Sequence, residues 1–209
     1  DLTASEVGAK IILTDKLVRQ SAENVFSMIG RQLGDGMARK KDVDVLALYS
    51  GFSTDIGAAG RSMSLANVSA AVAYAKGKKF GSNVYIVQHP FAVWDIANTA
   101  VTASSTYPVP AGWSADLLGN FFSGLRPING VPIFEDGNIS IDSSDDAVGV
   151  IADRSALGVL KSVDMNKEQD RDISLRATEV VITADYGVFE LDDSKGVALT
   201  LDAGTPATS

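Results

Sequence analysis

Apolar side chains in the first fifty residues are spaced first as in a strand and then as in a helix. Residues 7–13 (Val-Gly-Ala-Lys-Ile-Ile-Leu) look extended, and Thr14 or Asp15 then supplies a helix N-cap. Between residues 16 and 40, apolar residues recur every three or four positions, which predicts one amphipathic helix about 37 Å long. Its apolar stripe consists of Val18, Ala22, Val25, Phe26, Ile29, Leu33 and Met37.

Charged residues lie on the other side of this predicted helix. Arg19 is four positions from Glu23, and Asp35 is four positions from both Arg31 and Arg39. Opposite charges at this spacing are neighbours on a helix surface, so ion pairs can form there.

Glycines interrupt the same segment at positions 30, 34 and 36. Each costs about 1 kcal/mol relative to alanine inside a helix. We expect them to cause fraying near the C-terminal end, a bend, or the close packing of another backbone.

Helices and strands alternate through the middle of the chain. Pro90 after His89 opens a helix, because proline is favoured in the first helical turn. Residues 102–114 are rich in Ser, Thr and Pro and are the most loop-like stretch. The predicted order is a buried run at 43–49, a loop of small residues at 50–62, a helix at 64–76, a strand at 84–87, a helix at 91–100, the loop at 102–114 and a short helix at 116–123.

The remaining residues are strongly β in pattern. Strands are predicted on both sides of the turn at 135–138 and at 147–152 and 159–163. The alternation changes phase near Thr178 and Glu179, which predicts a bulge there. Apolar runs at 187–191 and 197–201 flank a polar five-residue turn, which predicts a hairpin.

Composition and charge narrow the class of protein. The chain has 209 residues, of which 45% are hydrophobic and 21% are charged, as in globular proteins with a sizeable core. No apolar run approaches the ~20 residues of a membrane helix. With no cysteine, disulfides, thiolate catalysis and zinc–thiolate sites are excluded. A net charge of −8 argues against general nucleic-acid binding.

The candidate catalytic and metal-binding patterns lack the accompanying residues that such sites require. His89 is the single histidine, and no G-x-S-x-G motif accompanies it. The acidic series at 164–172 has Gln169 and Leu175 where a calcium loop needs Gly and Glu, so it reads as a solvated turn. We therefore assign no catalytic, cofactor-binding or metal-binding residue.

Four segments resemble sequences of tailed-phage major capsid proteins, a fold shared with encapsulin shells and the herpesvirus capsid floor. Residues 7–20 resemble a strand of the family's extended loop that returns into a long spine helix. Residues 83–90 resemble a strand-to-helix step in its axial domain, and residues 130–133 a Gly-x-Pro-aliphatic turn. Residues 170–188 resemble its closing peripheral strands.

The resemblance implies an α+β phage major-capsid fold with a long spine helix, a peripheral β-rich domain and an inserted axial domain. Residues 1–13 would be the returning strand of the extended loop, and 204–209 a loose tail. The peripheral domain would combine 14–50 with 140–203, around an axial domain at 51–139. Since the family has further sequence before the spine helix, we expect a substantial N-terminal part to be absent from this chain.

The resemblance also implies a function by assembly and not by catalysis. Copies of the chain would form hexamers and pentamers of an icosahedral shell around double-stranded DNA, without sequence-specific binding, cofactor or membrane. Scaffold, portal or decoration proteins are further expected partners, and the location is the virion capsid, assembled in the host cytoplasm. The alternatives are an encapsulin-like compartment, a soluble enzyme with a pocket in the axial region, and a lone binding module.

Candidate assembly residues follow from apolar exposure, charge and aromatic content. Residues 7–13 should form an arm with few contacts to their own subunit, covered by a neighbour. Tyr107 and Trp113 offer large contact area in a proline-restricted loop. The family resemblance implies that this loop lies at the centre of each capsomer, so we expect it at the capsomer axes. The full set is Val7, Ile11, Ile12, Leu13, Arg19, Arg31, Arg39, Tyr107, Pro108, Pro110 and Trp113.

Overall fold

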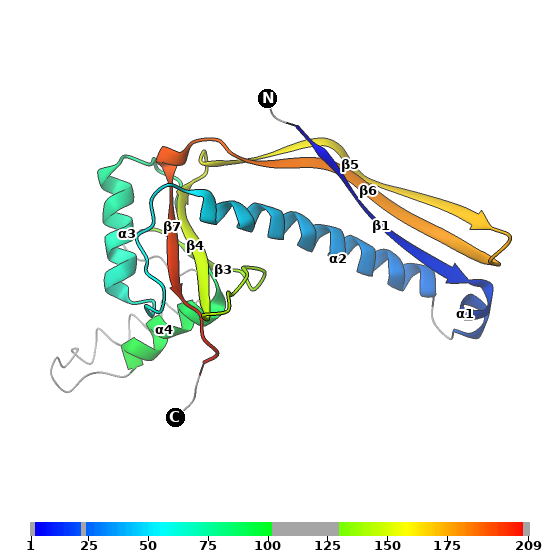
Figure 1. The fold of residues 1–209 in the computed structure, drawn as a ribbon, viewed down its shortest axis with the longest axis horizontal. Helices are drawn as coiled ribbons and strands as arrows, with labels where there is room; N and C mark the ends of the chain where they lie inside the picture. Colours follow the sequence, from blue (N-terminus) through cyan, green and yellow to red (C-terminus); the bar gives the residue numbers. More distant parts are fainter. Residues whose placement is uncertain (1–2, 22–23, 102–129, 207–209) are drawn as a thin grey trace. The chain divides into compact units, whose positions relative to one another are not determined.

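The computed structural model describes residues 3–21, 24–101 and 130–206, which divide into two compact units (Figure 1). One unit comprises Asp1–Val45 and Gly158–Phe189, and the other comprises Leu46–Leu157 and Glu190–Ser209. The predicted loop at 102–114, the short helix at 116–123 and the last residues of the tail, 207–209, lie outside the described residues.

The first unit is a three-stranded sheet with a long helix on one face. Strand β6 (Ala177–Glu190) lies between β1 (Ser5–Thr14) and β5 (Leu157–Asp172). β1 and β6 are antiparallel, from Ser5 opposite Tyr186 to Thr14 opposite Ala177. Helix α2 (Val25–Leu46) runs along these strands, and its apolar stripe forms a core with β1 and β6. This core contains Leu13, Val25, Ile29, Leu33, Met37, Val180, Ile182, Ala184 and Tyr186.

The predicted single helix is in fact two. Helix α1 (Asp15–Gln20) starts at the Thr14 cap, where the Leu17 N–H donates to Thr14 Oγ1 over 3.4 Å, as predicted. It ends at Ser21, which has an extended backbone. Asn24 then accepts from the Ser27 N–H over 3.3 Å, at the start of α2. These polar residues satisfy helix ends, so the apolar spacing alone overestimated the helix.

The three glycines do not end the helix. α2 continues through Gly30, Gly34 and Gly36 to Leu46, so the expected fraying is wrong. A Cβ placed at any of the three meets no atom within 4 Å, so close packing of another backbone is also wrong. The buried run at 43–49 forms the end of α2 and a 3-10 helix, η1 (Ala47–Gly51).

The second unit is built on a four-stranded sheet in the order β3-β2-β4-β7. Strand β2 (Val84–Gln88) is parallel to β3 (Ile133–Glu135), and β4 (Asp146–Asp153) is antiparallel to both β2 and β7 (Gly196–Asp202). Helices α3 (Leu65–Gly77) and α4 (Pro90–Val101) share its core, as their predicted apolar faces require. Buried His89 begins α4, since its Nδ1 accepts the Phe91 N–H over 3.2 Å.

Four β predictions are wrong. A strand was expected on each side of the turn at 135–138, but only β3 precedes it, and the residues after it form an isolated bridge from Ile141 to Ala147. β6 and β7, joined by the 3-10 turn η2 (Asp193–Lys195), lie in different sheets and form no hairpin, because β7 pairs with β4. No bulge occurs near Thr178, since the β1–β6 register is one-to-one. The change in the alternation of apolar residues instead comes after a turn that begins beyond Asp172. In this turn, Arg176 has a φ of 47°. The acidic series at 164–172 is part of strand β5 and not a turn.

The observed units also differ from the predicted domain limits. Residues 140–157 and 190–203 were expected in the peripheral domain, but they belong to the second unit together with 51–139. The reason is strand pairing, because β4 joins β2 to β7 within one sheet.

Candidate assembly surface

The expected apolar arm is part of its own sheet. Val7 and Ile11 are half-buried, and Leu13 is only 1% exposed, because alternate residues of β1 face α2 while β6 supplies the backbone partners. Ile12 points to the other face and is 46% exposed. The prediction of few contacts with its own subunit is therefore wrong, and Ile12 alone keeps the expected exposure.

The other predicted residues are scattered or lie outside the described residues. Arg19, Arg31 and Arg39 are exposed, and the Arg19 Nε donates to the Asp15 carbonyl over 3.3 Å. The expected pairs of Asp35 with Arg31 and Arg39 are not among the ion pairs of the described residues; the pair along α2 joins Lys40 to Asp44. Tyr107, Pro108, Pro110 and Trp113 fall within 102–129, outside the described residues.

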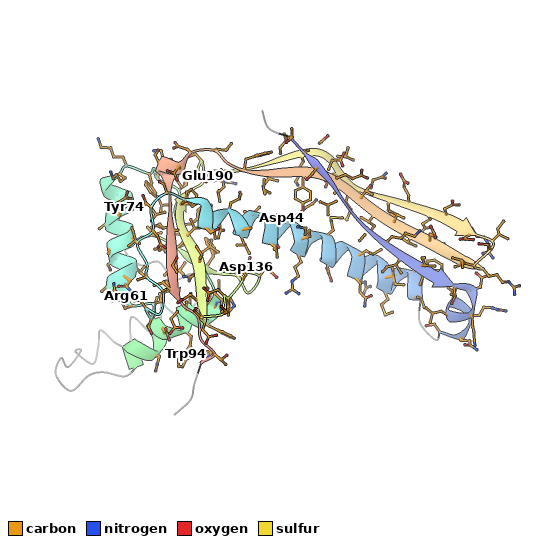
Figure 2. The ribbon with its side chains drawn as sticks, in the orientation of Figure 1. Asp44, Arg61, Tyr74, Trp94, Asp136 and Glu190 are labelled. Carbon is orange, nitrogen blue, oxygen red and sulfur yellow. The ribbon has the colours of Figure 1, made fainter. Side chains whose placement is uncertain are left out.

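A polar network that the sequence did not reveal ties α2 to the strands. The Tyr186 hydroxyl donates to Asp44 Oδ2 over 2.6 Å, 142 positions apart in sequence. Asp44, on α2, is labelled in Figure 2. Lys41 Nζ lies 5.5 Å from the Tyr186 ring centroid and 3.7 Å from Asp164 Oδ1. These contacts connect α2 with both β6 and β5.

The network shifts the proton affinities of its members. Burial and the bond to Asp44 raise the pKa of Tyr186 to about 12. Burial alone raises the pKa of Asp44, but the bonds from Lys40 and Tyr186 outweigh it and hold that pKa below its ordinary value. At neutral pH the pair is thus a neutral phenol donating to a carboxylate, a charge-assisted bond.

Strand β5 is the most exposed element of the first unit. Every residue from Val159 to Arg171 is exposed. Val159, Val163 and Met165 are each 46–50% exposed, which is unusual for apolar side chains on a strand. Since β5 is an edge strand, it offers both faces and one edge.

The edge of β5 is partly closed by its own side chains. Asp164 Oδ1 accepts the Met165 N–H over 2.9 Å, and Asp170 Oδ1 accepts the Arg171 N–H over 2.7 Å. Unpaired edge groups are where a further strand would add. These two bonds occupy donors that such a strand would need.

The described residues contain no group of three or more His, Cys, Asp or Glu placed to hold a metal ion. The His89 side chain accepts a hydrogen bond from the backbone at the start of α4. Burial lowers the pKa of His89, although the negative charge of Asp136 opposes this shift. None of the helices in the described part of the chain is both long and apolar enough to cross a membrane.

The sequence profile of the family described as "Phage capsid protein" matches residues 2–200. The chain belongs to the phage capsid protein family. A search of curated proteins found no match.

Solved structures show that the capsid protein has the expected α+β phage major-capsid fold. The chain is similar to a structure of Mycobacterium phage Che8, with a TM-score of 0.76 and 14% identity over 93% of this chain and 70% of that one. The chain is also similar to the capsid of Ralstonia phage GP4, with a TM-score of 0.77 and 13% identity over 100% of this chain and 76% of that one. For an encapsulin complex from Synechococcus elongatus, the TM-score is 0.70 and the identity is 9%, over 99% of this chain and 77% of that one. The family match over residues 2–200 makes this chain a structural protein of a viral capsid.

Proposed function

We propose that the capsid protein forms hexamers and pentamers that close into an icosahedral shell around double-stranded DNA. The observation that carries this proposal is the family match over residues 2–200 together with the exposed strand β5. Apolar side chains that their own subunit leaves uncovered, such as Val159, Val163 and Met165, are a surface for other copies. Heterologous contacts between copies can close into the rings that hexamers and pentamers require.

The function lies in association and not in catalysis. The shell belongs to the virion and is assembled in the host cytoplasm, with scaffold, portal or decoration proteins as further partners. Within this proposal the first unit corresponds to the peripheral domain and the second to the axial domain, with residues 1–13 as the returning strand of the extended loop. Tyr107, Pro108, Pro110 and Trp113 lie at the capsomer axes.

Electron microscopy of the expressed protein tests this proposal. We expect closed particles with five- and sixfold units, formed in a concentration-dependent manner. A monomeric mass that does not change with concentration would contradict assembly. Particles that package protein instead of DNA would favour the encapsulin-like alternative, for which the fold similarity to an encapsulin is the supporting observation.

The interaction with DNA should be weak for an isolated subunit. With a net charge of −8, the capsid protein has few basic groups to release counterions from duplex DNA. An inner wall that adheres weakly suits release of the genome. Tight binding of the isolated subunit to duplex DNA at physiological salt would refute this part of the proposal.

A further inference from the structure

Strand β5 separates its charges by face. Successive side chains of a strand point to opposite faces, so odd and even positions form two surfaces. We call them the basic face, with Val159, Lys161, Val163, Met165, Lys167 and Arg171, and the acidic face, with Leu160, Asp164, Asn166, Glu168, Asp170 and Asp172. A 3.2 Å bond from the Asn166 amide to Glu168 Oε1, two positions on, supports this alternation.

Contacts within the chain leave most of these charges available. Arg171 reaches Asp15 over 2.9 Å, and Asp164 lies 3.7 Å from Lys41. The side chains of Arg171 and Asp164 nevertheless stay 61% and 79% exposed, and ion pairs of such exposed groups contribute little. Lys161 and Lys167 have no ion-pair partner within 4 Å among the described residues. The apolar side chains of the basic face are also uncovered, so a partner could bury both.

A twofold strand pairing of two β5 edges would bring the basic face of each copy beside the basic face of the other. If two copies paired antiparallel about Asn166, Lys161 would lie opposite Arg171 and Asp164 opposite Glu168. A twofold contact between the same face of two copies would also bring like charges together. In addition, the Met165 and Arg171 N–H groups on the edge are already bonded to side chains.

We propose that the basic face of β5 in one capsid protein contacts the acidic face of β5 in the next, in a heterologous contact. The occupant of each face is a second copy of this chain, because the two faces of one strand are complementary in charge to each other. Such a contact runs in one direction from copy to copy and can close into a ring. This inference rests on the proposed assembly and specifies one of its contacts.

Charge reversal of each face, separately and together, tests the contact. Lys161→Glu/Lys167→Glu makes both faces acidic, and Asp164→Lys/Glu168→Lys/Asp170→Lys makes both basic. Particle yield of the full chain, measured by sedimentation and electron microscopy, should fall about tenfold or more for each, because like charges then meet. The variant with all five changes should regain particles, because the charges of the two faces are then exchanged within one chain. At 1 M NaCl, where the screening length is about 3 Å, the single-face defects should shrink.

Controls separate this contact from folding and from net charge. Lys16→Glu/Arg154→Glu adds the same four negative charges as the basic-face variant, at exposed sites elsewhere, and should assemble like the parent. Circular dichroism melting checks that each variant folds; if the Asp164→Lys change, which puts a second cation beside Lys41, prevents folding, Glu168→Lys/Asp170→Lys replaces the triple change. Normal assembly of the single-face variants, or no recovery when all five changes stand in one chain, overturns the inference. Failure of the parent to form particles refutes the proposed function instead.

Discussion

Leu13→Ala should strongly destabilise the capsid protein, whereas Ile12→Ala should not. The two residues are neighbours on β1, but Leu13 is 1% exposed in the core against α2 and Ile12 is 46% exposed on the opposite face. Truncating Leu13 removes buried carbons worth about 0.8 kcal/mol each and leaves a cavity. We expect a loss of about 3 kcal/mol for Leu13→Ala and about 1 kcal/mol for Ile12→Ala.

Urea unfolding followed by circular dichroism measures this difference. In a domain whose total stability is about 5–15 kcal/mol, a loss of about 3 kcal/mol moves the midpoint clearly. Hydrogen exchange should also show protected amides along β1, since β6 pairs with it over its whole length. Equal losses for the two variants, or fast exchange throughout β1, would show that the strand is a loose arm after all.

Three further predictions concern the network, a buried histidine and the loop. Tyr186→Phe removes the bond to Asp44 and should lower the free energy of unfolding in urea by about 1.5–3 kcal/mol, whereas no change would mean that the bond contributes nothing. Because the pKa of His89 is lowered in the fold, stability should fall as pH drops below about 6.5, where the unfolded chain takes up the proton. A His89→Asn variant should lose this pH dependence in melting experiments between about pH 7.5 and 5.5. Trp113→Ala should reduce particle yield more than melting temperature; equal losses, or normal assembly, would contradict its place at the capsomer axes.

Local patterns predicted the elements that depend on nearby residues. The Thr14 cap, helices α3 and α4 and strands β2 and β4 all appear where apolar spacing and polar caps indicated them. The order of these elements and the family resemblance predicted the fold class. These signals are strong because each depends on residues within a few positions of one another.

Partners that are distant in sequence could not be predicted in the same way. A short polar turn between β6 and β7 looks like a hairpin, yet β7 pairs with β4, which lies earlier in the chain than β6. The bond between Asp44 and Tyr186 links a helix to a strand 142 positions away. The charged run in β5 resembles a turn, because the usual strand pattern requires a buried face that this edge strand lacks.

The aspartates along the edge of β5 are relevant to aggregation by strand addition, which is a risk for any protein that assembles from many copies. An open strand edge accepts strands without limit, and fibres grow from segments of about six or seven residues. The bonds at Met165 and Arg171 leave only five residues between them, 166–170, in the C-terminal half of β5, fewer than such a segment needs. In this half of the strand, side-chain contacts of defined number and angle are therefore favoured over the addition of strands, and such contacts can close a particle of finite size.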